Sequence, residues 1–67
     1  MKATKFRDLS DDELAREIHG LRKALFNLRV QQAIGQLEKP HQLSATRRDL
    51  ARALTVQRER HAVEETQ

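Results

Sequence analysis

The 67-residue sequence contains no cysteine, tryptophan or tyrosine, and only one proline, two glycines and two phenylalanines. The absence of cysteine excludes disulfides and thiolate metal sites, and it agrees with a reducing compartment. A chain this short, with so few aromatic side chains, is unlike an enzyme with a walled active site. No apolar run reaches the length of a signal peptide or a membrane span, so we expect a cytosolic protein.

The residues that are abundant, mainly Leu, Ala, Arg, Glu and Gln, favour helix. Ser10 and Glu13 form a capping box, which predicts the start of a long helix. Large apolar residues then recur at alternating spacings of four and three, the pattern of a heptad seam: Leu14, Ile18, Leu21, Leu25 and Leu28. Pro40 forces the preceding Lys39 out of helical geometry, and it suits the first turn of a second helix.

These signals predict an all-α fold, an antiparallel two-helix hairpin in a single domain over residues 1–67. A short N-terminal helical turn, with Phe6 and Leu9 as its apolar side, should come first. We expect the first long helix at about residues 10–36, the turn at 37–40 and the second helix at about 41–61. Residues 62–67 continue no apolar seam and are expected to fray.

The second helix has two unlike faces. One is the packing side, formed by Leu43, Thr46, Leu50, Ala53, Leu54 and Gln57. The other carries three arginines around small residues: Arg47, Arg48 and Arg52 around Ser44, Ala51 and Thr55. Short side chains between arginines leave room for a phosphate backbone, which guanidinium groups can then grip from either edge. A basic helix face of this kind is also typical of an ordinary solvated surface.

The distribution of charge says more than the net charge of +3. Between Gly20 and Arg58 the chain has eight basic and two acidic residues, whereas most acids lie at residues 8–17 and 59–65. In a hairpin, the turn end would therefore be basic and the opposite end acidic. Such polarity suggests a polyanionic partner for the basic end.

A second apolar stripe on the first helix consists of Phe26, Val30, Ala33 and Leu37. A two-helix hairpin covers only one side of each helix, so this stripe should stay exposed beside Arg22 and Arg29. It then suits a partner, either an RNA groove or another protein, or else self-association.

No other pattern points to chemistry. His19, His41 and His61 are far apart and lack companions at ligand spacing, so we expect no metal, and no cofactor motif is present. The competing interpretation is a small helical regulator that dimerises through the Leu14–Leu28 seam and binds DNA. Its recognition helix would usually place base-reading side chains near its N-terminus, whereas these arginines lie in the middle of the helix.

Residues 39–53, KPHQLSATRRDLARA, resemble the signature of a known family, that of the twenty-ninth protein of the bacterial large ribosomal subunit. Supporting matches are MKA at 1–3, FNLR at 26–29 and GQL at 35–37, and the resemblance runs from end to end. It implies a helical hairpin that binds large-subunit ribosomal RNA and is not an enzyme.

The resemblance also implies a place and a set of contacts. Members of that family lie near the exit of the polypeptide tunnel, beside another ribosomal protein and where nascent-chain factors dock, with no membrane or small-molecule partner. This location gives the Phe26 stripe a protein neighbour to contact. Carried over by position, the RNA contacts are Arg29, Gln36, Lys39, His41, Arg47, Arg48, Ala51, Arg52 and Thr55.

Overall fold

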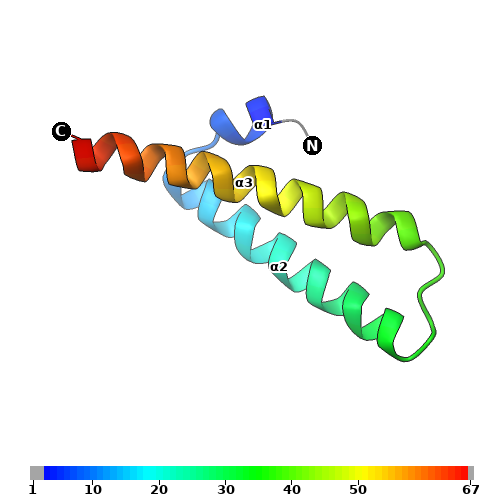
Figure 1. The fold of residues 1–67 in the computed structure, drawn as a ribbon. Helices are drawn as coiled ribbons and strands as arrows, with labels where there is room; N and C mark the ends of the chain where they lie inside the picture. The colour runs from blue at the N-terminus through cyan, green and yellow to red at the C-terminus, as the bar shows by residue number, and fades with distance from the viewer. Residues whose placement is uncertain (1–2, 67) are drawn as a thin grey trace.

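The computed structural model describes residues 3–66, with side chains for residues 4–62. Three helices follow one another: α1 (Ala3–Arg7), α2 (Asp11–Ala33) and α3 (Pro40–Thr66). The two long helices run antiparallel, and α1 lies against α3 (Figure 1). The predicted all-α hairpin with a short N-terminal helix is confirmed. The molecule has the shape of a rod of 48 × 17 × 17 Å. Met1, Lys2 and Gln67 lie outside the described residues.

The start of α2 is fixed by the predicted capping box. The Ser10 hydroxyl oxygen accepts the backbone N–H of Glu13 at 3.2 Å, and the same hydroxyl donates to the Glu13 carboxylate at 3.1 Å. Asp11 and Asp12 complete an acidic first turn. Negative charge at this end is favourable, because the unpaired N–H groups of the first turn carry a partial positive charge.

The end of α2 is set by Gly35 rather than by Pro40. Gly35 has φ +73°, a left-handed conformation that glycine adopts without steric cost. The Gly35 N–H bonds to the Gln32 carbonyl at 3.1 Å, and the Gln36 N–H bonds to the Gln31 carbonyl at 2.8 Å. This pair of bonds is a Schellman cap. The expected end at about residue 36 is therefore wrong by three residues, because the cap formed at Gly35 stops α2 at Ala33.

The other end of the hairpin turn agrees with the sequence, since Pro40 is the first residue of α3. The expected end of this helix at residue 61 is wrong, because α3 continues to Thr66. Residues 62–66 contain no proline or glycine, and Ala62, Glu64 and Glu65 are good helix formers. Loss of the apolar seam removes packing but supplies no signal that stops a helix.

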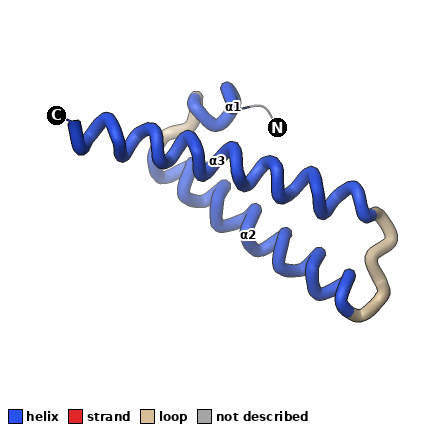
Figure 2. Tube along the Cα trace, viewed as in Figure 1, coloured by secondary structure: helices blue, strands red, loops and turns tan. Residues whose placement is uncertain are grey.

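The core lies toward the α1 end of the rod, and α2 and α3 diverge toward the turn, as Figure 2 shows. It is built from all three helices by Phe6, Leu14, Ile18, Ala53 and Val56, with Leu9, Leu21, Leu50 and Leu54 packed against it. Leu25 is also buried, whereas Leu28 and Leu43, nearer the turn, are half-buried. The heptad seam of α2 and the packing side of α3 therefore meet as predicted.

Polar contacts tie α1, its linker and the first residue of α2 to α3. The Arg60 guanidinium pairs with Asp11 at 2.8 Å and donates to the backbone carbonyls of Arg7, at 3.2 Å, and of Leu9. Arg7 pairs with Glu59 at 3.1 Å. Asp11 and Glu59, two of the acidic residues at this end, thus help to hold the fold together.

Candidate nucleic-acid interface

The arginine face of α3, defined here as Ser44, Arg47, Arg48, Ala51, Arg52 and Thr55, points away from the core. Arg47 and Arg48 are exposed, and together with Ser44 and Ala51 they line a shallow hollow. The short side chains of Ser44 and Ala51 leave that space open, and the two guanidinium groups stand beside it. This is the arrangement that the sequence pattern predicted for close approach of a phosphate backbone.

Arg52 lies at the edge of this face, in a different electrostatic setting. Its Nη1 is 3.8 Å from Asp49 Oδ1, one helical turn back. The Asp49 carboxylate partly neutralises the Arg52 guanidinium, so a phosphate bound there would lie close to a negative group. Thr55 is also engaged, because its hydroxyl donates to the Ala51 carbonyl at 2.8 Å. The Thr55 oxygen keeps its lone pairs and can still accept a hydrogen bond.

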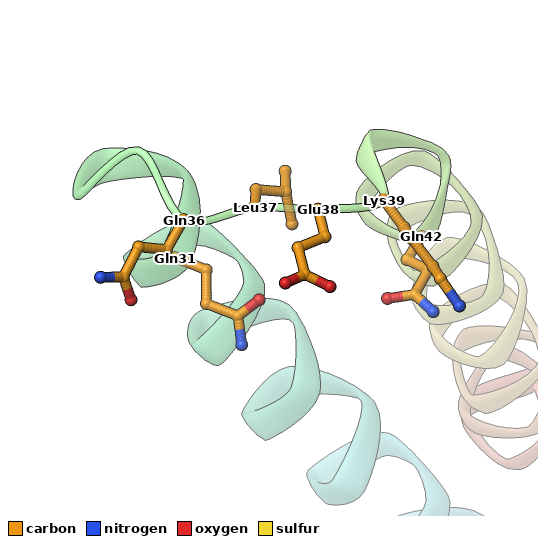
Figure 3. A pocket seen from close by; sticks show the side chains of 6 residues that line it. All are labelled: Gln31, Gln36, Leu37, Glu38, Lys39 and Gln42. Carbon is orange, nitrogen blue, oxygen red and sulfur yellow. The ribbon is translucent and has the colours of Figure 1, made fainter.

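A separate hollow lies at the hairpin turn, and Gln36 and Lys39 line it from its two sides (Figure 3). Its other lining residues are Gln31, Leu37, Glu38 and Gln42. Figure 3 shows the Glu38 carboxylate between Gln31 on the α2 side and Lys39 and Gln42 on the α3 side. This hollow is therefore mixed in charge, and its amide groups suit hydrogen bonding.

The two remaining candidate contacts, Arg29 and His41, are both exposed but line neither hollow. Arg29 lies on α2 and His41 in the first turn of α3. The structure thus groups the nine candidates into an α3 cluster, a turn cluster and these two single positions.

The exposed apolar stripe differs in membership from the prediction. Phe26 and Val30 are 66% and 43% exposed, and Ala33 is exposed as well. Leu37 is half-buried in the turn beyond the end of α2, so its helical spacing from Ala33 has no meaning there. Ile34, 60% exposed, takes its place. Its spacing of four from Val30 is the signal in the sequence that could have identified it.

Membrane spans and metal clusters are both absent from the part of the chain that the structure describes. None of the described helices is both long and apolar enough to cross a membrane. No group of three or more His, Cys, Asp or Glu side chains in residues 4–62 is placed to hold a metal ion.

Comparison with known proteins identifies the family. The profile described as Ribosomal L29 protein matches residues 4–60, a range that reaches all three helices and includes every candidate RNA contact. The chain belongs to the ribosomal L29 family. Proteins of this family are structural constituents of the large ribosomal subunit rather than enzymes, and so is this chain.

Individual members of the L29 family are similar over nearly their whole length. Large ribosomal subunit protein uL29 of Persephonella marina is 55% identical over 60 residues, which cover 90% of this chain and 88% of that protein. The uL29 protein of Desulfitobacterium hafniense is 48% identical over 60 residues, with 90% of each chain covered. That of Syntrophotalea carbinolica is 47% identical over 62 residues, which cover 92% of this chain and all of the relative.

Proposed function

We propose that this L29-family protein anchors itself to large-subunit ribosomal RNA through the arginine face of α3, near the exit of the polypeptide tunnel. The turn cluster and the single positions Arg29 and His41 add contacts around that anchor. The exposed apolar stripe of α2, extended to Ile34, then meets a neighbouring ribosomal protein. The location and the contacts of Arg29 and His41 rest on the family resemblance, and the geometry of the two hollows supports the other contacts.

The hollow on the arginine face is the observation that carries this proposal. A phosphate group that enters between Arg47 and Arg48 meets the small side chains of Ser44 and Ala51 instead of a steric barrier. Each guanidinium offers a planar fork of N–H donors, which matches two phosphate oxygens at once. Charge-assisted bonds of this kind are the usual way in which proteins position themselves on a nucleic-acid backbone.

RNA carries a 2′-hydroxyl group that DNA lacks, and the arginine face has a hydrogen-bond acceptor for this group in Thr55. The Thr55 hydroxyl donates to the Ala51 carbonyl, so its free lone pairs suit the 2′-hydroxyl of a ribose. The described part of the face has no exposed aromatic side chain on which a base could stack. The contacts are therefore to phosphates and sugars, and the protein reads the shape of the RNA.

The competing hypothesis, a dimeric DNA-binding regulator, needs a free apolar seam. The Leu14–Leu28 seam instead packs against α3 of the same chain, with Leu14, Ile18 and Leu25 buried. A monomer on size exclusion is therefore expected.

Sedimentation of cell lysate tests the proposal. A tagged copy should travel with the large subunit on a sucrose gradient, and the Arg47→Ala, Arg48→Ala variant should shift toward the top as the salt concentration rises. Wild-type protein that remained free of the large subunit in low salt would overturn the proposal. If the variant stayed on the large subunit at the same salt concentrations as the wild type, the RNA contact would have to lie on another surface of the protein.

A further inference from the structure

A third hollow, between α2 and α3, brings together basic residues that the sequence did not connect. Arg22 of α2 lines it with Arg58 and His61 of α3, next to Leu54, Gln57 and Ala62. It opens on the side of the hairpin away from α1. Val56, which packs with Phe6 in the core, lies about 200° around α3 from Arg58.

The arginines in the half of the rod near α1 include some that pair with a carboxylate and some that do not. Arg7 pairs with Glu59 and Arg60 pairs with Asp11, so both hold the fold together. Arg22 and Arg58 have no ion pair with any described side chain, and none of the residues that line their hollow is acidic. Two guanidinium groups that share a hollow repel each other until an anion lies between them.

We propose that the hollow of Arg22, Arg58 and His61 is a second phosphate site for the backbone of large-subunit ribosomal RNA. This assignment rests on the proposed function and extends its footprint to the middle of α2. The two guanidinium groups bind the phosphate oxygens from the two helices. The His61 imidazole adds an N–H donor in either protonation state, and Leu54 provides an apolar floor that shields the contact from water.

The position of the hollow favours RNA over a separate acidic partner. Arg47 and Arg58 are eleven residues apart, so they lie within about 20° of one another around α3 and about 16 Å apart along it. Arg22 and Arg29 are seven residues apart and share one side of α2 in the same way. A backbone that runs along this side of the hairpin therefore reaches the arginine face and the second site in succession.

The three histidines allow a test on the wild-type chain. Full-length large-subunit ribosomal RNA of the source organism, transcribed in vitro, is bound to the protein, and the histidines are modified with diethyl pyrocarbonate and quantified by mass spectrometry. His19, His41 and His61 are all exposed in the free protein, so each should react there. The RNA should protect His61 and His41 and leave His19 reactive.

Each pattern of protection has a distinct meaning. If His41 is protected while His61 reacts like His19, the second site is wrong and the proposed function stands. If neither His41 nor His61 is protected, the second site is wrong, and the proposed function fails with it if the Arg47→Ala, Arg48→Ala variant also keeps the wild-type salt dependence of binding.

Charge-matched variants provide an independent measurement. The Arg22→Gln, Arg58→Gln pair should reduce the slope of log K against log salt by roughly one to two units, since two phosphate contacts are lost. Arg16→Gln with Lys23→Gln removes the same charge from exposed positions outside the hollow, and it should change the slope by less than half as much. Equal effects of the two pairs would mean that net charge alone matters, which overturns the site. The Arg22→Lys, Arg58→Lys pair should recover most of the wild-type slope.

Discussion

Arg48 and Arg52 lie about one turn apart on α3, yet their surroundings make them unequal partners for a phosphate. Arg48 lines the open hollow, whereas Arg52 lies 3.8 Å from the Asp49 carboxylate. We expect Arg48→Ala to weaken ribosomal RNA binding about tenfold, or about 1.4 kcal/mol, and Arg52→Ala to weaken it less. Filter binding at a fixed salt concentration measures both. A larger loss for Arg52→Ala would show that Asp49 orients that arginine rather than neutralising it.

The two glycines should respond to alanine with opposite signs. Gly20 lies inside α2 with open space where the methyl group of an alanine would stand, so Gly20→Ala should stabilise the protein by about 0.5–1 kcal/mol. Gly35 has φ +73°, so Gly35→Ala should destabilise it by about 1 kcal/mol. Urea unfolding followed by circular dichroism gives both values. Shifts in the same direction would contradict the Schellman cap as the element that ends α2.

At the scale of elements, the main anchors of α1 are the buried ring of Phe6 and the Arg60 guanidinium, and the exposed Arg7–Glu59 pair adds a weaker contact. Arg60 bonds to Asp11 and to carbonyls of α1 and its linker, and its side chain is 25% exposed. Arg60→Ala should lower the free energy of unfolding by about 1–3 kcal/mol, because several charge-assisted hydrogen bonds are lost. Arg7→Ala is the control and should cost less than about 1 kcal/mol, since the Arg7–Glu59 pair is half-exposed. Equal melting temperatures for the two variants would rule out Arg60 as the anchor.

The two sides of α2 have different roles, and substitutions at the adjacent residues Leu25 and Phe26 test each role in turn. Leu25 is buried against α3, so Leu25→Glu should place a charge in the interface and unfold the hairpin. Phe26 is 66% exposed, so Phe26→Glu should leave the helicity close to that of the wild type while it weakens incorporation into the large subunit. Circular dichroism and gradient sedimentation separate these effects. Equal losses of helicity would remove the case for a second contact surface.

The elements could be predicted from the sequence better than their ends. Heptad spacing and the Ser10 cap are sufficient for the hairpin, because both are local signals. Gly35 suits either a weak seam position or a helix stop, and only its observed φ decides between them. The contribution of Val56 to the core could not be predicted either, because it depends on where α1 packs against α3.

In the candidate site, the residues that share one helix face could be predicted from the sequence, whereas the contacts between helices could not. Arg47 and Arg48 share a face of one helix, and the 3.6-residue period alone brings them together. The meeting of Arg22 with Arg58 depends on the register of two antiparallel helices, which spacing within one helix does not fix. For the same reason, no sequence pattern indicates that Glu38 lines the turn hollow together with Gln31 and Gln42.

On the scale of the whole molecule, the rod has a structural end and a binding side. Near α1, Arg7 and Arg60 pair with carboxylates, Arg60 also bonds to backbone carbonyls, and the core is concentrated there. Along α3 toward the turn, Arg47 and Arg48 stand exposed beside an open hollow. Folding and RNA binding therefore use different arginines, so each can be changed without the other.

The salt dependence of ribosomal RNA binding tests this separation most directly. Wild-type protein, the Arg47→Ala, Arg48→Ala variant and the Arg16→Ala, Lys23→Ala control are titrated with large-subunit RNA at several salt concentrations. The first pair should flatten the plot of log K against log salt by roughly one to two units with unchanged helicity, and the control pair should change it much less. A slope for the Arg47→Ala, Arg48→Ala variant equal to that of the wild type would make the arginine face an ordinary solvated surface.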